Sequence, residues 1–271
     1  MPAGYVQSLT RYPVKSMQGE PLDAVSLDAN GLTGDRRLAL IDTQTNKVVS
    51  AKQPQHYRAL LDCSARTVDG RLRIELPDMS VLDPDQALAP LSELLGRPLH
   101  WQPAQPGALG SYASTWPRLA GLTMSGDHDL NMAMATKAVS FVDMAAVHLM
   151  TRSTLTQLET FSPQSQFDPR RFRPNIMVDS DDGGFAEEQW IGRKLQVGEC
   201  VLQVSMRTPR CVMTTVAQPG LANDIGVLRA AANNIHELGQ GNRFACAGVY
   251  AEVIRPGVVR IGDALALLPD D

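Results

Sequence analysis

The chain is poor in cysteine and has no cysteine pair with the spacing of a metal or redox motif. Its 271 residues include four cysteines, which lie apart at Cys63, Cys200, Cys211 and Cys246. A disulfide scaffold uses more cysteines, and a zinc ribbon or a thioredoxin-type site uses a Cys-x-x-Cys pair. The pattern argues against all three classes, and we expect the four side chains to be free thiols.

Excess positive charge and long apolar runs are also missing. The net charge is −4, which argues against a surface that coats nucleic acid. The most apolar long window, residues 130–150, contains charged and polar side chains and is too polar to span a bilayer. The first residues have neither the basic nor the apolar region of a secretory signal. We therefore expect a cytoplasmic protein that binds neither nucleic acid nor membrane.

What is present is the composition of a globular protein, with 44% hydrophobic and 20% charged residues. The length suits one large domain or two modest ones. Short aliphatic and β-branched runs between turn signals favour an antiparallel barrel or sandwich in the first hundred residues, and the second half is mixed. The strands are predicted at residues 5–9, 24–27, 37–42, 59–66, 71–76, 176–178, 195–197, 201–206, 248–254, 258–261 and 264–268, and the helices at 83–96, 143–159 and 224–238. The prediction is an α+β fold dominated by β-structure.

Cys211 has the most unusual surroundings of the four thiols. It follows an alternating pattern in Arg207-Thr208-Pro209-Arg210-Cys211, and Pro209 cannot continue a sheet ladder, so we expect Cys211 to lie on a loop. The guanidinium groups of Arg207 and Arg210 favour the thiolate, the form that binds metals and attacks electrophiles. A small buried apolar side chain is the alternative. The other three cysteines have apolar, strand-like neighbours and are predicted to be structural.

Two further segments concentrate positive charge. Residues 169–174 contain three arginines between two prolines, a stiff cationic loop whose guanidinium forks suit phosphate or a planar heterocycle. Near the start, Lys15, Arg36 and Lys52 stand at the ends of predicted strands and would form one anion-binding rim if those ends meet. A solvated charge cluster is the alternative for the first segment, and separate surface cations are the alternative for the second.

Taken together, these segments resemble the MOSC family, which is named after the C-terminal domain of molybdenum-cofactor sulfurases. Residues 12–16, 31–36 and 51–53 resemble motifs of the β-barrel domain that precedes the MOSC domain in this family, and residues 171–176, 210–215 and 256–263 resemble the MOSC domain itself. The resemblance implies an N-terminal β-barrel packed against a C-terminal MOSC β-barrel with flanking helices. We predict these domains at residues 1–100 and 127–271, with a connection or pocket-covering loop at 101–126.

The resemblance also implies a molybdenum-pyranopterin cofactor, as in the amidoxime-reducing members of the family. Cys211 would be the molybdenum ligand and the catalytic residue. The residues implied to hold the cofactor are Lys15, Ser16, Arg36, Lys52, Thr151, Arg152, Arg171, Arg173, Asn175, Arg210 and Cys211. The physical chemistry agrees, because a soft thiolate suits molybdenum already bound by sulfur, and a phosphate group needs several fixed donors.

The activity implied is the two-electron reduction of small N-hydroxylated compounds such as amidoximes or hydroxylamines. No Cys-x4-Cys-x2-Cys pattern for an iron–sulfur cluster occurs in the chain, so we expect the electrons to come from a separate redox protein. Two alternatives stay open: a carrier that holds sulfane sulfur or the cofactor on Cys211, and a binding module for another phosphorylated ligand. The pattern identifies neither the proton donor nor the oligomeric state.

Overall fold

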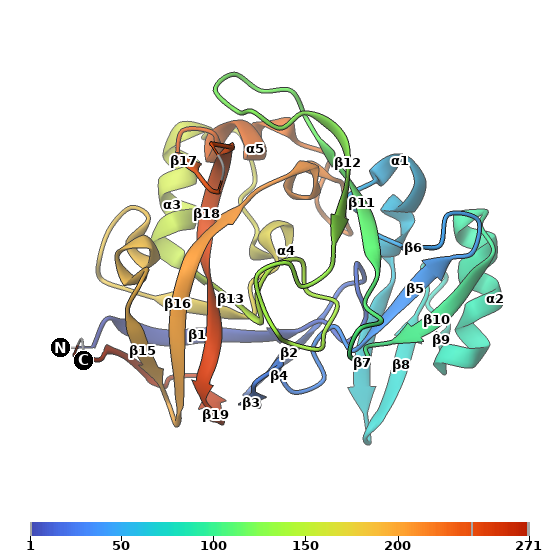
Figure 1. Cartoon of the computed structure of the whole chain (residues 1–271), viewed down its shortest axis with the longest axis horizontal. Coiled ribbons are helices and arrows are strands. Elements are labelled where there is room, and N and C mark those ends of the chain that lie inside the picture. The colour runs from blue at the N-terminus through green and yellow to red at the C-terminus, as the bar shows by residue number, and fades with distance from the viewer. Residues whose placement is uncertain (1, 240, 270–271) are drawn as a thin grey trace.

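Strands dominate the computed structural model (Figure 1), which describes residues 2–239 and 241–269, and this confirms the predicted fold class. Seven strands close into a barrel, because the last of them pairs back with the first. In spatial order they are β13 (Val147–Thr151), β14 (Ile176–Asp179), β1 (Gly4–Arg11), β20 (Ala264–Leu267), β15 (Lys194–Val197), β16 (Cys200–Pro209) and β18 (Arg243–Arg255). Two short strands add to this sheet: β2 (Glu20–Leu22) pairs with β1, and β17 (Ile235–Glu237) pairs with β18.

The first strand of the chain is therefore part of a barrel otherwise built from the second half. Val6 and Leu9 on β1 point into the barrel core, where they pack with Ile176 and Leu265 from strands on either side. A further small sheet joins the two halves, in which β3 (Ala24–Asp28) lies between β4 (Gly31–Leu32) and β19 (Gly257–Arg260). The two halves thus share backbone hydrogen bonds as well as an interface.

The rest of the N-terminal half has its own core, on the right in Figure 1. One sheet consists of β5 (Leu38–Asp42), β6 (Lys47–Val48) and β10 (Leu99–Pro103), and another of β7 (Ser64–Val68), β8 (Arg71–Glu75) and β9 (Val81–Leu82). The helix α2 (Pro84–Leu95) covers them and buries Ala87 and Leu91. Asp83 precedes this helix and Gly96 ends it with a left-handed conformation (φ 60°), as the sequence predicts.

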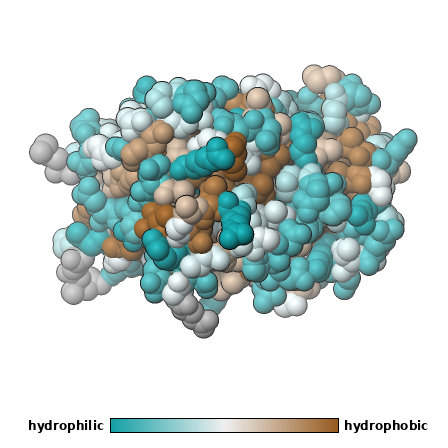
Figure 2. All heavy atoms as spheres, turned by 90° about the horizontal axis from the view of Figure 1, so that it is seen from above, coloured by the Kyte–Doolittle hydropathy of each residue, from teal (hydrophilic) through white to brown (hydrophobic). Residues whose placement is uncertain are grey.

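The remaining elements are short. They are α1 (Pro54–Tyr57), η1 (Arg58–Asp62), the hairpin of β11 (Ser111–Trp116) and β12 (Gly126–Asn131), α3 (Arg152–Phe161), α4 (Pro169–Phe172), η2 (Ala186–Trp190), η3 (Val212–Thr215) and α5 (Ile225–Ala231). Seen from above, the barrel half shows an apolar area surrounded by hydrophilic side chains (Figure 2). No helix in the described ranges is long and apolar enough to cross a membrane.

Two of the predicted helices are wrong over part of their length. The segment predicted as one helix at 143–159 forms β13 and then α3. All five residues of β13 are buried, and the strand pairs with a neighbour on either side, so its apolar residues do not follow the spacing of a helix face. The segment predicted as a helix at 224–238 forms α5 and then β17, whose residues pair with the first three residues of β18. In both cases strand pairing overrides the local spacing, with distant strands for β13 and with the strand that follows directly for β17.

Three other predictions need smaller corrections. The strand predicted at 59–66 is divided into η1 and β7. The short strand predicted at 248–254 belongs to β18, which runs for 13 residues because it pairs along its length with β16, β13 and β17. The connection predicted at 101–126 contains β11, so it is not without regular structure. The domain boundaries themselves stay a prediction.

Candidate functional site

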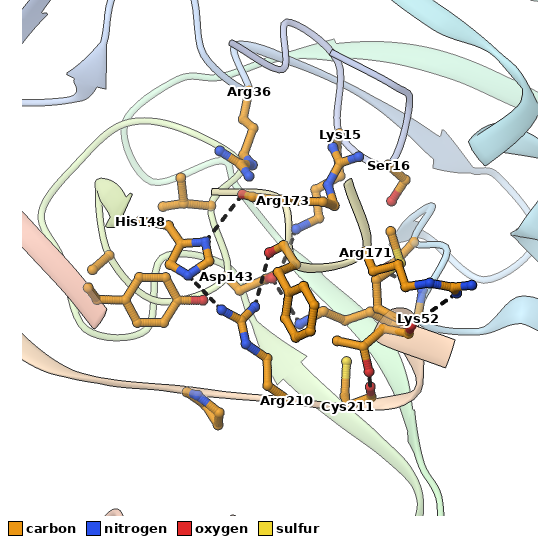
Figure 3. Close-up of a pocket in the computed structure, with 18 of the residues that line it drawn as sticks. Lys15, Ser16, Arg36, Lys52, Asp143, His148, Arg171, Arg173, Arg210 and Cys211 are labelled. Carbon is orange, nitrogen blue, oxygen red and sulfur yellow. Dashed lines mark hydrogen bonds and ion pairs between the residues drawn. The ribbon is translucent and has the colours of Figure 1, made fainter. Parts of the chain in front are cut away.

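A cavity lies where the two halves meet, and it gathers nine of the eleven residues that the sequence suggested for cofactor binding (Figure 3). These nine are Lys15, Ser16, Arg36, Lys52, Arg171, Arg173, Asn175, Arg210 and Cys211. The first four come from loops that leave the N-terminal strands, and the others come from the loops around α4 and the end of β16. Segments that are far apart in sequence thus place their cations around one space.

One wall of the cavity is a bridged pair of lysines. Lys15 Nζ lies 2.5 Å from one carboxylate oxygen of Asp143, and Lys52 Nζ lies 2.9 Å from the other. Both ammonium groups also lie 5.0 Å from the ring centroid of Tyr112. Burial alone would raise the pKa of Asp143, but the two lysines outweigh it and hold that pKa well below its usual range. Burial lowers the pKa of Lys15 to about 8, although Asp143 opposes the shift.

Three residues of the cavity have left-handed backbone conformations that side-chain-bearing residues rarely adopt. They are Ser16 (φ 68°), Arg36 (φ 47°) and Arg173 (φ 57°). Each of these turns directs a side chain toward the cavity, and Ser16 Oγ also accepts a hydrogen bond from the backbone N–H of Ala51. Strained conformations of this kind persist where the surrounding structure holds them, and they concentrate at functional sites.

Arg36 and Arg173 share one aromatic platform but differ in their partners. Their guanidinium carbons lie 4.8 and 4.0 Å from the ring centroid of Tyr12. Arg36 forms an ion pair with Asp35, whereas both terminal nitrogens of Arg173 are buried and have no hydrogen-bond partner among the described residues. Burial lowers the pKa of Arg173 to about 10. This leaves Arg173 charged at neutral pH, with donors that no protein acceptor occupies.

Arg210 is held by neutral acceptors. Its guanidinium donates to the carbonyl oxygens of Ala247 (2.8 Å) and Phe172 (3.0 Å), and one nitrogen lies 2.6 Å from His148 Nε2. Burial and the charge of Arg210 lower the pKa of His148 well below its ordinary value, so the ring is neutral. With Nε2 as the acceptor, Nδ1 carries the proton and donates to the carbonyl of Arg173, 3.2 Å away.

Glycine at position 248 makes this contact possible. Gly248 has φ +82°, and a Cβ atom placed there would lie 2.5 Å from His148 Nε2 and 3.2 Å from the Arg210 guanidinium. The backbone of β18 therefore approaches both side chains more closely than any other residue would permit.

Cys211 lies between the end of β16 and η3, which confirms its predicted place on a loop. Its sulfur points into the cavity (Figure 3), and only 5% of the residue is exposed. Behind it lies an apolar cluster that includes Trp116 and Met213. Arg207, which the sequence placed beside the thiol, instead forms an ion pair with Glu188 at 2.7 Å and does not line the cavity.

Comparison with known proteins is consistent with this two-part architecture. The model of the MOSC domain matches residues 136–266, and the model of the MOSC N-terminal beta barrel domain matches residues 3–102. This chain belongs to the MOSC family. The two matches leave out most of the segment that contains β11 and β12.

Named relatives of this MOSC protein are similar to it at low identity. Mitochondrial amidoxime-reducing component 1 of Mus musculus is 23% identical, over 98% of this chain and 82% of that protein. Molybdenum cofactor sulfurase of Oryza sativa subsp. japonica is 24% identical, over 79% of this chain and 28% of that protein. Among solved structures, the YUAD protein from Bacillus subtilis aligns over 97% of this chain and 93% of that chain, with 11% identity and a TM-score of 0.46.

Two of the residues suggested for cofactor binding in this MOSC protein lie away from the cavity. Thr151 is buried as the N-cap of α3, where it accepts a hydrogen bond from the backbone N–H of Thr154 and donates to the carboxyl group of Glu187. Arg152 is exposed on the first turn of the same helix. The hydroxyl of Thr151 is therefore engaged by a carboxyl group and by the N-terminus of α3, and its part in cofactor binding stays a prediction.

Sequence reasoning missed four side chains of the site: Tyr12, Asp143, His148 and Tyr250. Tyr12 lies beneath two arginines, and the other three line the cavity. For Asp143 and His148, the only local signal was a polar side chain within an apolar window. This signal does not distinguish a residue of the site from a structural one. The three buried cysteines were predicted correctly, since Cys63, Cys200 and Cys246 have no exposed surface.

Proposed function

We propose that this MOSC protein binds a molybdenum-pyranopterin cofactor and reduces small N-hydroxylated compounds with electrons from a separate redox protein. One observation carries the proposal: the thiol of Cys211 faces a buried wall of cations, among which the donors of Arg173 have no protein partner. A buried guanidinium without an acceptor is costly, so the residue is best explained by an anion that binds there.

The charge balance of the cavity supports an anionic ligand. Six cationic side chains line it, and Asp143 is the single carboxylate among the lining residues that the structure describes. Arg36 has its own counter-ion in Asp35, but Arg173 and Arg210 have no carboxylate within ion-pair distance in the described ranges. A phosphate group with oxygen acceptors supplies the missing negative charge in the geometry that guanidinium groups favour.

The thiol fits the other end of the same ligand. A thiolate is a soft donor and suits a metal that already has sulfur ligands, which is the donor set of molybdenum in a pyranopterin dithiolene. Arg173 and Ser16 would hold the phosphate and pterin together with Lys15 and Arg36, and Cys211 would hold the metal. When bound, this group would supply two-electron redox chemistry to the substrate.

Space in the cavity places one condition on this assignment. Its free volume is about 80 Å³, which is small beside the roughly 300–1,000 Å³ of most small-molecule sites. Entry of a pyranopterin therefore requires side chains to move, and Lys15 and Lys52 are the long flexible ones. Their ion pairs with Asp143 would open as the phosphate takes the place of the carboxylate.

The reaction consumes two electrons and two protons, converts an N–OH group to N–H and releases water. The chain's residues would bind the substrate beside the metal, keep bulk water out and hold protons. Lys15 Nζ keeps its proton at neutral pH, since its pKa is about 8, so it can attract an anionic group of the cofactor. The name of the first relative, an amidoxime-reducing component, supports this substrate class.

Elemental analysis of protein purified from a host that makes the cofactor tests the proposal. We expect about one molybdenum per chain in the wild type and essentially none in Cys211→Ala, with Cys200→Ala as the matched control because Cys200 lies buried outside the cavity. The loaded protein should then reduce benzamidoxime with an artificial electron donor.

Two results would contradict the proposal. Wild-type protein without molybdenum but with cyanide-labile sulfur on Cys211 would identify a sulfur carrier, the activity class that the sulfurase relative favours. Full molybdenum occupancy without reduction of any N-hydroxylated compound would remove the proposed reaction and leave only cofactor binding.

A further inference from the structure

We infer that Arg171 is a positioning residue that fixes the loop carrying Cys211, and that it is not a ligand of the anion in the cavity. The inference rests on the proposed function in one respect, namely that Cys211 is the functional thiol. Arg171 is 1% exposed, and every nitrogen of its guanidinium donates to a backbone carbonyl. Four of its five N–H donors are therefore engaged by the protein before any ligand arrives.

Three of the four acceptor carbonyls lie on the segment that follows Cys211. Arg171 Nη1 donates to the carbonyls of Thr214 (3.3 Å) and Val216 (3.4 Å), and Nη2 donates to that of Ala222 (2.7 Å). The fourth bond, from Nε, goes to the carbonyl of Gln166 at 3.0 Å. One guanidinium thus connects the segment before α4 to one carbonyl of η3 and to two carbonyls of the loop between η3 and α5.

This loop is coupled directly to the cysteine. Cys211 is the residue from which η3 begins, and its carbonyl accepts hydrogen bonds from the backbone N–H of Thr214 at 3.4 Å and from Thr214 Oγ at 3.2 Å. Arg171 holds the carbonyl of that same threonine. The position of the thiol therefore depends on Arg171 through a single residue.

The three arginines of this segment have different environments. Arg170 is 44% exposed, forms an ion pair with Asp168 at 2.8 Å and donates to the carbonyl of Pro219. Arg171 gives four of its five N–H donors to backbone carbonyls. Arg173, whose terminal nitrogens are buried without partners, is the one that offers donors to a ligand. Lysine cannot replace Arg171, because a single ammonium lacks the planar fork that reaches carbonyls on both sides.

Thiol reactivity in the cofactor-free protein tests this role. We would measure the rate of iodoacetamide modification at each cysteine by peptide mass spectrometry in the wild type, Arg171→Met, Arg171→Lys and Arg170→Met. We expect modification of Cys211 to accelerate about tenfold or more in both Arg171 variants, the factor for losing one buried hydrogen bond to a charged group. Arg170→Met, the same substitution on the exposed neighbour, removes a single partly exposed contact with this loop at the carbonyl of Pro219, so it should leave the rate within about twofold.

The other three cysteines distinguish a local effect from unfolding. Cys63, Cys200 and Cys246 are fully buried in separate places, so their rates should not change in the Arg171 variants. Unchanged reactivity of Cys211 in both variants, or an equal increase at all four cysteines, would overturn the inference. A second measurement is calorimetric titration with inorganic pyrophosphate: Arg171→Lys should bind it within about threefold of wild type, and a loss of binding equal to that of Arg173→Met would make Arg171 a ligand after all.

These measurements are independent of molybdenum. If the wild type proves to contain no metal, the proposed function fails while the thiol rates still decide whether Arg171 fixes the loop.

Discussion

The two cationic walls of the cavity differ in how their charge is balanced. Lys15 and Lys52, from the N-terminal half, share the carboxylate of Asp143 and are neutralised by protein. Arg173 and Arg210, from the barrel half, have no carboxylate partner in the described part of the chain, and Arg173 has unpartnered donors as well. The difference indicates that the arginine wall is built for an anion, whereas the lysine wall can be closed without one.

Such an asymmetry has opposite consequences for stability and binding. A paired buried charge is compensated in the empty protein, so removal of one partner destabilises it, and its counter-ion must be displaced before a ligand anion can bind. An unpaired buried charge destabilises the empty protein and is ready for a ligand. Substitutions in the two walls should therefore change stability and affinity in opposite directions.

The largest effect is expected for Arg173→Met. In the cofactor-free protein, its affinity for inorganic pyrophosphate should fall by about a hundredfold, because two charge-assisted hydrogen bonds are lost. Its free energy of unfolding should rise by roughly 1–2 kcal/mol, since an uncompensated buried charge is removed. Calorimetric titration and urea unfolding measure the two quantities, and a less stable variant would show that Arg173 is already compensated in the empty protein.

Asp143→Asn should have the reverse pair of effects. Without its carboxylate, both ammonium groups become available and pyrophosphate affinity should increase about tenfold at low ionic strength. The free energy of unfolding should fall by about 2–3 kcal/mol, because two buried ammonium groups lose their counter-ion. The same two measurements apply, and weaker pyrophosphate binding would mean that Asp143 serves mainly to orient the lysines toward the ligand.

The smallest effect is the pH dependence that Lys15 introduces. Its pKa of about 8, lowered by burial, means that the ammonium loses its proton as the pH rises from 7 to 9. Sulfate keeps a constant charge between pH 7 and 9, so a change in its affinity reports the charge of Lys15. We expect the affinity for sulfate to fall by about three- to tenfold, which corresponds to the loss of one buried positive charge. Lys15→Arg, which stays charged, should bind sulfate without this dependence, and the same decline in the variant would place the titration elsewhere.

Most of the site's chemical components could be predicted from short segments. The loop position of Cys211 follows from Pro209 and the preceding strand pattern, and the cationic segments are visible as runs of arginine. Their convergence could be expected only through the family resemblance, because strand β1 joins a barrel formed by strands beyond residue 147. Local spacing also misled: β13 was predicted as helix although it pairs with β18, about a hundred residues away, and β17 was predicted as helix although it pairs with the first residues of β18, directly after it in the chain.

The roles of individual charged residues could not be predicted in this way. Asp143 acts through Lys15, 128 residues away, and His148 through Arg210, 62 residues away. Arg171 and Arg173 are two positions apart in one motif, yet the left-handed backbone at Arg173 directs it to the cavity while Arg171 meets carbonyls. No local pattern distinguishes them.

By itself the sequence determined the family, the β-dominated class, the loop with its thiol and the supply of cations, because turn residues, prolines and residue types act over a few positions. Only the tertiary structure decided which cations are neutralised and which are left for a ligand. Burial and Coulomb attraction depend on the distances between side chains in space, and in this cavity those side chains come from both ends of the chain.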